Sequence, residues 1–556
     1  MVDDARSAVE ARYDQLSEEF FEVYYTYHSP HATRQGLHQY DDHLGHYRRD
    51  AVEETLRRMK VIQAKVARID PAGMDRWHAI DHPVLTTRLK REIYWIETWR
   101  FWERNPLFYK DTIVEGVFNL ISRSFAPLDE RLKSVISRQR QVPQVLEAAR
   151  ANLANPPYEY TEQAIRLMPG AIRFFRSLPG QFENVQDNRL LSALRESNDF
   201  VLEALESFLV YLQDDLLPRS QGSFAVGEAG IQAILDAEEM IDVPVTEILA
   251  RCYDHLQEVE RQIDDLARQI DPAATADELR ERMLARHPAA GELLPMMHHE
   301  LARMRSYLTE RDLLTLPPEM PDVIVSPMPG YASGGGMMLT PGPFETVAKE
   351  SYLMVHLPQP GWPAERVQAQ LRDFNLYSTV LLFLHEAYPG HHTQFYLEQR
   401  VPLRASKDHD SDSNSDGWAE YGKYMMIDEV YGQQDPLYLF GALVSKRAYI
   451  VRAIIGMEIH LQARTLSEAA SWMEAKAGIM SASAYGLLDR AVYYPTHLTY
   501  HIGCEMVRKL RADYETLHAS EFNLKEFHDR FLTYGLIPLK VIRQDMLGLA
   551  DDGVLF

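Results

Sequence analysis

The sequence predicts a mainly α-helical protein with a small β-sheet. Its 556 residues, 46% of them hydrophobic, are enough to bury a large core and to form more than one domain. Several long segments place apolar residues three and four positions apart, which is the spacing of an amphipathic helix. Runs typical of strands are few, and clusters of proline, glycine and polar residues separate the periodic segments. Together these observations favour a helical fold class.

The helices with the clearest periodicity are expected, in chain order, at residues 128–142, 198–212, 245–270 and 443–462. Two short apolar runs are expected to form strands, at residues 323–326 and 352–357. Turn-forming clusters occur at residues 155–157, 218–222 and 317–342. The cluster at 218–222 indicates a boundary between an N-terminal helical region, 1–220, and a catalytic region, 221–556, which the first region would cover.

Charge and composition exclude several classes of protein. The net charge of −23, from 58 basic and 81 acidic residues, argues against binding to nucleic acid, and no basic run offsets it. Two cysteines, Cys252 and Cys504, are too few for a disulfide framework. The N-terminal residues are charged and lack the apolar core of a signal peptide. No segment has the roughly 18 consecutive apolar residues of a membrane span. We therefore expect a cytoplasmic protein with no membrane partner.

The most informative segment runs from Val380 to His392 and reads VLLFLHEAYPGHH. Its apolar run leads directly into His385 and Glu386. An adjacent His-Glu pair at the end of an apolar helix is how many zinc metalloproteases present their first metal ligand and their general base. Buried histidine and glutamate are costly without a partner, and a divalent metal ion would be that partner.

The spacing of the histidines differs from that of the HExxH motif. On a straight helix, His391 would lie about 240° around the axis from His385, and His392 would lie on the same face but about 10 Å further along. Neither could share a metal ion with His385, so we predict a bulge or break at Pro389-Gly390. His391 is the first candidate for the second ligand, and His392 is the alternative. A metal-free helix that ends in capping histidines would be the purely structural explanation.

This segment resembles the HEAxPGHHxQ signature of the bacterial family called domain of unknown function 885, which is grouped with the gluzincin peptidases, beside carboxypeptidase Taq and the oligopeptidases. The resemblance covers most of the chain, because further similar stretches lie at residues 30–41, 331–344, 351–355, 447–460 and 490–503. It implies a large helical gluzincin-like fold with a small β-sheet beside a deep active-site cleft, and a preference for short peptides. The chain departs from the family at Gly456, where an Asp is usual, and at His497, where a Gln is usual.

The third metal ligand is expected from a carboxylate on a second helix. Residues 416–424, DGWAEYGKY, resemble the family's EGWALYAE motif, with Asp416 and Lys423 in place of its first and last Glu. Asp416 and Glu420 are four residues apart and share a helix face, so one could bind the metal while the other holds a histidine. We rank Asp416 slightly before Glu420, although Asp416 could instead be a helix N-cap. The polar stretch at 407–416 joins the two metal helices and is expected to be a mobile loop.

The expected mechanism follows from these parts. Two imidazoles and one carboxylate leave one position of a zinc ion open for water. Zinc lowers the pKa of that water and polarises the scissile carbonyl, while Glu386 accepts the proton and passes it to the leaving amine. Tyr500 is the candidate donor to the oxyanion, because related gluzincins use a late tyrosine or histidine there. His497 and His501 are alternatives to Tyr500 in this role. The purely structural explanation is that this segment is only a packed aromatic part of the core.

Four residues are candidates for substrate binding. Gly335 and Gly336 belong to a Gly/Pro loop, 333–343, that would let a backbone approach closely. Tyr352 begins an apolar run that, as an edge strand, would pair with an extended peptide. Arg490 could bind a substrate carboxylate in a bidentate manner, although an ordinary ion pair is favoured for it.

The sequence therefore predicts a zinc-dependent hydrolase with one ion per chain, most simply a peptidase that acts on small peptides. A zinc hydrolase of non-peptide amides or esters is the first alternative, because the motifs specify an activated water and a carbonyl but not the groups on either side. The second is a non-catalytic protein that binds a ligand in a relic site. The pattern does not distinguish exopeptidase from endopeptidase action, nor does it define the metal or the oligomeric state.

Overall fold

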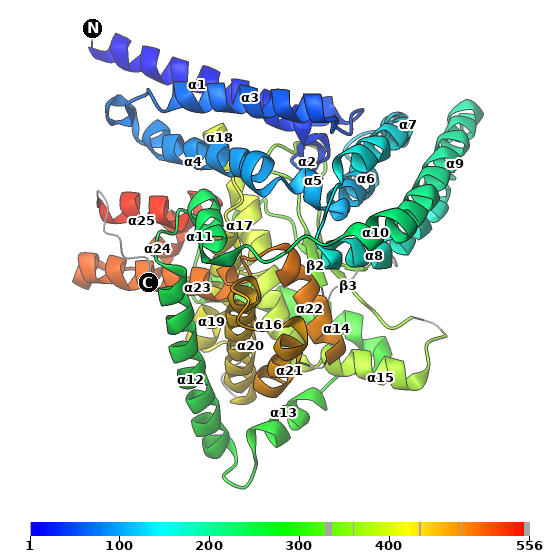
Figure 1. Cartoon of the computed structure of the whole chain (residues 1–556). Helices are drawn as coiled ribbons and strands as arrows, with labels where there is room; N and C mark the ends of the chain where they lie inside the picture. The colour runs from blue at the N-terminus through cyan, green and yellow to red at the C-terminus, as the bar shows by residue number, and fades with distance from the viewer. Residues whose placement is uncertain (1, 329–335, 360, 433–434, 480, 550–556) are drawn as a thin grey trace.

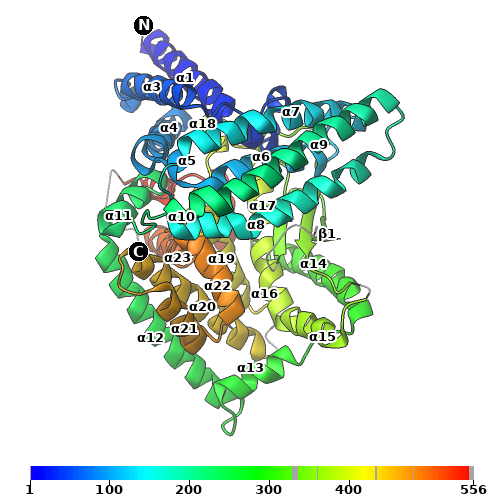
Figure 2. The same ribbon diagram turned by 45° about the vertical axis from the view of Figure 1, so that its right-hand side comes forward.

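The chain forms a mainly helical fold with one small sheet, as predicted (Figure 1). The computed structural model describes residues 2–328, 336–359, 361–432, 435–479 and 481–549. The N-terminal helices form the upper layer in Figure 1, and the rest of the chain lies beneath them. In Figure 2, α7, α8 and α9 extend to one side as an arm.

The upper layer contains α1 (Val2–Tyr27), α2 (Ser29–Arg34), α3 (Arg49–Val66), α4 (Arg76–Ile93), the π-helical turn η3 (Tyr94–Trp99), α5 (Phe101–Arg104), α6 (Pro106–Ile121), α7 (Leu128–Asn152), α8 (Tyr158–Ser177), α9 (Asn188–Tyr211), the π-helical turn η5 (Leu212–Leu216) and α10 (Leu217–Arg219). Short 3₁₀ turns accompany them: η1 (His38–Tyr40), η2 (Pro71–Gly73) and η4 (Leu178–Phe182).

The lower part begins with α11 (Gly227–Glu238), α12 (Val245–Ile270), α13 (Ala276–Leu284), η6 (Ala290–Glu292) and α14 (Leu293–Glu310). The strands are β1 (Val323–Pro327), β2 (Gly336–Leu339) and β3 (Ser351–Val355). The last group is α15 (Ala364–Asp373), α16 (Leu376–Glu386), α17 (His391–Glu398), α18 (Arg404–Lys407), α19 (Asp412–Asp428), α20 (Leu437–His460), α21 (Leu466–Ala477), α22 (Ser481–Tyr493), α23 (Thr499–His518), η7 (Ala519–Glu521), α24 (Leu524–Leu532) and α25 (Leu539–Leu547).

The predicted helices are confirmed, and α12 illustrates why the periodicity identified them. Its buried positions recur at three- and four-residue intervals along one face, which packs against α20. Burying each large aliphatic side chain contributes about 1.5–3 kcal/mol, so one apolar stripe is enough to fix the helix on its neighbour. The predicted boundary at 218–222 is not a break in the core, because one hydrophobic cluster includes residues from both layers, and α4 packs on α11, α18 and α25. The domain division stays a prediction.

The sheet corrects two predictions from the sequence. Its strand order is β1-β3-β2, with β3 parallel to β1 and antiparallel to β2. Tyr352 therefore lies on the central strand, paired with Ile324 and Leu339, and has no free edge for a peptide. Part of the expected Gly/Pro loop is strand β2, which starts at Gly336 opposite Val355. Alternation and length identified strands here, but strand order depends on which segments meet in space.

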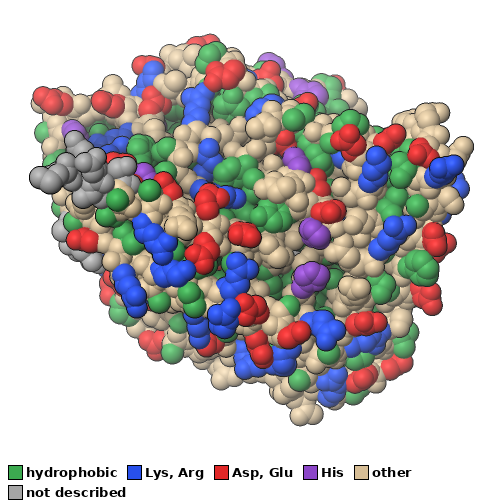
Figure 3. Space-filling view, turned by 90° about the horizontal axis from the view of Figure 1, so that it is seen from above, with side chains coloured by type: hydrophobic (Ala, Val, Ile, Leu, Met, Phe, Trp, Pro, Cys, Tyr) green, Lys and Arg blue, Asp and Glu red, His purple; other side chains and the backbone are tan. Residues whose placement is uncertain are grey.

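Other composition-based expectations have simple outcomes. Cys252 and Cys504 are buried and unbonded to each other. Within the described residues, every helix is too short or too polar to cross a lipid bilayer. Figure 3 looks down on the upper layer and shows acidic and basic side chains interspersed on that face.

His38 connects the upper layer to the segment before β3. Its Nδ1 lies 3.0 Å from Asp41 and its Nε2 lies 3.1 Å from Glu345, while its ring stacks on Phe125 at 3.8 Å. Burial lowers the pKa of His38, but the two carboxylates outweigh it and raise the pKa to about 9, while that of Glu345 falls to about 2. The charged histidine therefore stabilises the native state.

We expect His38→Gln to lower the free energy of unfolding by about 1–3 kcal/mol at pH 6 and by much less at pH 10. The folded-state pKa is raised, so this stability is complete below about pH 6.5 and is lost as the pH rises through 9. Urea unfolding at several pH values measures it. His43→Gln is the control, since His43 is exposed and pairs only with exposed Asp42. Equal destabilisation by His38→Gln at both pH values would contradict the expectation.

Candidate metal centre

The break predicted at Pro389-Gly390 is present and turns the chain sharply between two helices. Helix α16 ends at Glu386, and α17 begins at His391 after a cis Tyr388-Pro389 bond. Gly390 passes so close to the end of α16 that a Cβ there would lie 1.6 Å from the carbonyl oxygen of His385. The turn folds the second histidine back toward the first, which a continuous helix cannot do.

Helix α19 holds this turn in place. Trp418 donates a hydrogen bond of 2.9 Å from its indole nitrogen to the carbonyl oxygen of Pro389. One turn further, Gly422 leaves room for the proline ring, whose Cγ would be 2.8 Å from a Cβ at that position. The small residue and the indole donor therefore fit α19 against the turn that carries His391.

The structure brings His385, His391 and Asp416 together as a buried group. One ligand atom from each lies within 4.8 Å of the other two. Oδ1 of Asp416 is 3.4 Å from Nε2 of His391 and 3.9 Å from Nε2 of His385. The two imidazole rings are nearly perpendicular, with centroids 4.8 Å apart. Asp416 lies within α19, whose N-cap is Ser411, so the N-cap interpretation of Asp416 is wrong.

Glu420 takes a different position, on the far nitrogen of His385. Its Oε1 lies 2.9 Å from Nδ1 of His385 and 2.7 Å from Nζ of Lys423. Burial raises the pKa of Glu420, but the charge of Lys423 and the contact with His385 bring it down to about 2. Glu420 thus fixes the ring of His385 with Nε2 directed at the group, as a carboxylate behind a metal-bound histidine does.

His392, the alternative second ligand, is directed away from the group. It is fully buried, and its Nε2 lies 3.0 Å from the carbonyl oxygen of Pro321. Burial lowers the pKa of His392 to about 4, which keeps the ring neutral. His392 therefore packs against the segment that leads into strand β1, rather than against the candidate metal group.

The donor set fits a zinc ion. Two imidazole nitrogens and one carboxylate oxygen are the ligands of many catalytic zinc sites, which keep the fourth position open. The remaining nitrogens of both histidines meet groups that fix their orientation: Glu420 for His385, and Ser415, whose Oγ is 3.4 Å from Nδ1, for His391.

Two further predicted residues border the group. Glu386 is half-buried beside His391 and is one of the negative charges that raise the pKa of that histidine. Tyr500 stacks on His385 with ring centroids 6.0 Å apart, and it lies one turn before Gly503. A Cβ at Gly503 would be 2.9 Å from Cα of Gly417, so two glycines bring α23 close to α19 and place Tyr500 over the site.

Of the alternatives to Tyr500, His501 points away from the group and His497 is a buried neutral histidine. Nε2 of His501 lies 2.9 Å from Nδ1 of His255. His497 is buried, and burial together with Arg452 and Arg490 lowers its pKa well below the usual range. Gly456 makes room for His497, because a Cβ there would be 3.1 Å from its Cβ. Two departures from the family pattern therefore touch each other.

The ion pair that the sequence favours for Arg490 is not formed with any of the residues that the structure describes. Within the described chain, no carboxylate lies within ion-pair distance of Arg490 or of Arg452. Tyr500 is the main cause that raises the pKa of Arg490, followed by Asp416. Arg452 lies over the rings of Tyr449 and Tyr500, 4.9 Å from each centroid. Two guanidinium groups thus lie beside Tyr500, and neither pairs with an acid of the described residues.

The remaining substrate candidates are less informative. Gly335 lies outside the described residues. Gly336 and Tyr352 are paired within the sheet, as described above. Strand β2 lies against α16, so the edge strand nearest the metal group is β2.

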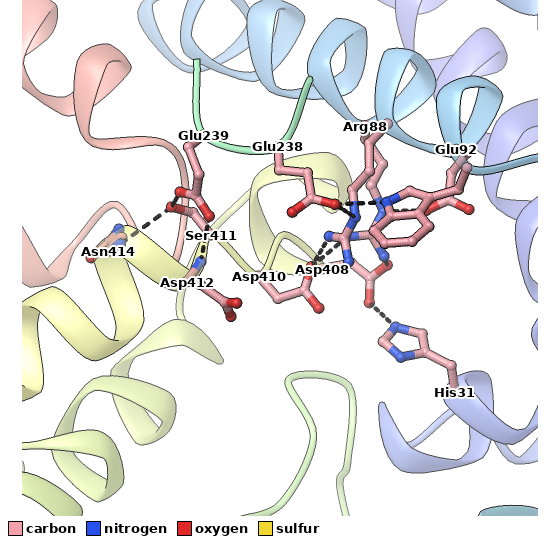
Figure 4. A network of polar contacts seen from close by, with 12 residues as sticks. His31, Arg88, Glu92, Glu238, Glu239, Asp408, Asp410, Ser411, Asp412 and Asn414 are labelled. Carbon is pink, nitrogen blue, oxygen red and sulfur yellow. Dashed lines mark hydrogen bonds and ion pairs between the residues drawn. The ribbon is translucent and has the colours of Figure 1, made fainter. Parts of the chain in front are cut away.

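The stretch at 407–416, predicted to be mobile, is a buried polar connection. Figure 4 shows Arg88 of α4 and Glu239, just after α11, meeting this stretch. Arg88 and Arg91 hold Asp410 at 2.6 and 2.7 Å. Glu239 accepts hydrogen bonds from the hydroxyls of Ser411 and Ser413 and from the backbone amides of Asp412 and Ser413. Polarity alone indicated a loop, but buried partners on distant helices fix it.

Reasoning from the sequence missed Lys423 as the partner of Glu420, and also Arg452 and Glu239. For Lys423, the clue in the sequence was that a lysine replaces the last glutamate of the family motif. Nothing in the sequence signalled the other two, since their partners are distant in the chain.

Comparisons with known proteins agree with this fold. A protein from Shewanella oneidensis, provisionally described as a lipoprotein of unknown function, is 24% identical, with a TM-score of 0.82 over 96% of this chain and 99% of that one. A protein from Colwellia psychrerythraea, also provisionally described as a lipoprotein, is 17% identical, with a TM-score of 0.78 over 96% and 98%. No curated protein matches the chain. Residues 30–546 match the family model described as "Bacterial protein of unknown function (DUF885)", and the chain therefore belongs to that family.

Proposed function

We propose that this protein is a zinc-dependent hydrolase of the gluzincin type, most simply a peptidase that acts on short peptides. The observation that carries the proposal is the buried group of His385, His391 and Asp416, with Glu420 behind His385 and Glu386 near His391. A structural cluster would not need a free carboxylate next to two ligand histidines. The gluzincin relationship rests on this arrangement and on the family motif.

Each residue has a role that follows from its position. When bound, zinc supplies Lewis-acid chemistry, which acidifies a water molecule and polarises a carbonyl. The Glu386 carboxylate accepts a proton from the attacking water and donates it to the leaving group. Tyr500 donates a hydrogen bond from its phenolic O–H to the developing oxyanion. Burial and Asp416 raise the pKa of Tyr500, so the phenol keeps that hydrogen at neutral pH.

The arginines favour substrates with a free carboxylate near the scissile bond. Guanidinium groups bind carboxylates through paired hydrogen bonds, and neither Arg452 nor Arg490 forms an ion pair with a residue that the structure describes. This arrangement favours removal of residues from a carboxyl terminus over cleavage inside long chains. Esters and non-peptide amides with a carboxylate in the same place are the second candidate, since they present the same groups.

Metal analysis tests the proposal directly. We expect about one zinc ion per chain in the wild type and less than about a tenth of that in His385→Ala, His391→Ala and Asp416→Asn. Glu420→Gln should bind zinc about 10–100-fold more weakly, because His385 would lose its orienting carboxylate. Elemental analysis after dialysis, with circular dichroism as a check on folding, measures both effects.

His392→Ala is the matched control, since His392 is adjacent in sequence but faces Pro321. It should retain zinc even if the protein is less stable. Wild-type protein that holds no stoichiometric metal after zinc is added back would disprove the hydrolase proposal. Zinc loss in His392→Ala together with retention in His391→Ala would disprove the ligand assignment.

We expect Arg490→Gln to raise KM about 10–100-fold for a peptide with a free carboxyl terminus, because a charge-assisted contact of about 1.5–3 kcal/mol is lost. The same substitution should change KM little for the peptide with an amidated terminus. Steady-state kinetics on the two peptides measures the difference. Equal effects on both substrates would mean that Arg490 does not bind the carboxylate.

The cytoplasmic location expected from the sequence stays a prediction. Two of the similar solved structures are provisionally described as lipoproteins. The proposal for the metal centre does not depend on the compartment.

A further inference from the structure

A pocket of about 420 Å³ lies between the upper layer and the segment that links α22 to α23. Five half-buried aromatic side chains form much of its wall: Trp95, Phe101, Phe108, Tyr493 and Tyr494. Trp95 comes from the π-helical turn η3, a type of turn that occurs often at functional sites. None of these residues has a role in the proposed hydrolysis.

The aromatic walls are held against one another from both sides of the pocket. Trp95 of the upper layer stacks on Tyr494 with ring centroids 5.9 Å apart and an interplanar angle of 15°. Phe101 meets Tyr493 edge to face at 5.3 Å and Trp95 at 5.2 Å. The pocket is therefore a preformed box of π faces rather than a gap between loops.

The charged residues of the lining are mainly acidic. Glu92, Asp111 and Glu115 line the pocket with a single arginine, Arg91. That arginine already pairs with two acids outside the lining, at 2.7 Å from Asp410 and 3.8 Å from Glu238.

The three acids differ in how far they are neutralised. Glu92 lies 3.2 Å from His28, and Asp111 lies 2.5 Å from Lys110. Glu115 is exposed to the pocket and has no cationic partner within the described residues. Burial and the nearby charge of Asp111 raise the pKa of Glu115, against the smaller opposing effects of Arg34 and Lys110. Aromatic faces and a carboxylate without a direct ion pair together favour a positively charged organic group.

We propose that this pocket binds an organic cation, through its ammonium or guanidinium group, against the aromatic walls and Glu115. A cation–π contact is strongest where water is excluded, and the carboxylate supplies the counter-charge that such burial requires. An anionic or neutral apolar ligand would leave Glu115 unpaired.

The pocket is linked to the candidate metal group through the segment that leads into α19. Arg91 in its wall contacts Asp410, and the proposed ligand Asp416 follows six residues later in the chain. From Asp412 to Asp416 the distance along the helix is about 6 Å. If the proposed hydrolysis holds, on which this extension rests, the cation is a basic group of the substrate.

Calorimetric titration of the Glu386→Gln protein tests the binding without turnover. The probes are the methylamides of Nα-acetyl-lysine and Nα-acetyl-norleucine, which share an apolar stem but differ in charge. We expect the lysine probe to bind at least 10-fold more tightly. In the same background, Glu115→Gln should weaken the lysine probe at least 5-fold and leave the norleucine probe unchanged.

Glu196→Gln is the matched control, because Glu196 is an exposed glutamate on α9 away from the pocket. It should bind both probes as the parent protein does. Equal affinity for the two probes, no binding of either, or an unchanged lysine affinity in Glu115→Gln would overturn the proposal. The titration requires neither zinc nor hydrolysis, so failure of the proposed function would leave this result interpretable, and the reverse also holds.

Discussion

Replacing Glu386 by glutamine is expected to reduce kcat for peptide hydrolysis by about 10²–10⁴-fold while zinc content stays at the wild-type value. Glutamine keeps the shape of the side chain but cannot accept a proton from the attacking water. Glu386 is not among the three residues whose ligand atoms converge, so the metal site should remain intact. Steady-state kinetics on a short peptide, with zinc measured on the same sample, gives both quantities.

Glu365→Gln provides the control for the change in charge. Glu365 is exposed in the first turn of α15, and no contact connects it to the metal group. It should leave kcat and zinc content unchanged. If Glu386→Gln kept wild-type kcat, the general base would have to be another group, and the mechanism proposed for this site would fail.

Replacing Gly390 by alanine is expected to destabilise the protein by about 3 kcal/mol or more and to reduce zinc affinity by at least about 100-fold. The new Cβ would lie 1.6 Å from the carbonyl oxygen of His385, which is a backbone atom and cannot rotate away. The turn must open, and this moves His391 away from His385 and Asp416. The urea midpoint and zinc content measure the two effects.

Gly73→Ala is the matched control, because a Cβ there would meet nothing within 4 Å. It should change the urea midpoint and the zinc content very little. An alanine at 390 that leaves both quantities unchanged would show that the close turn between α16 and α17 is not required for the metal site.

The sequence by itself determined the parts of this protein that depend on local rules. Apolar spacing identified the long helices, since a buried stripe must recur with the helical period, and α12 was located at its observed bounds. Pro389 and Gly390 required a break, because proline removes a backbone donor and a straight helix would separate the histidines. The candidates for the metal group were likewise local, in two short motifs.

The tertiary structure decided between candidates that local rules could not separate. Asp416 and Glu420 share one helix face, and only the position of α16 shows that the first meets both histidines while the second meets the far side of one. Strand order made Tyr352 central, and packing placed Arg490 beside Tyr500 rather than in an ion pair with any described residue. The aromatic pocket joins residues nearly 400 positions apart, Trp95 and Tyr494. Such contacts depend on how whole helices pack, which no local pattern in the chain encodes.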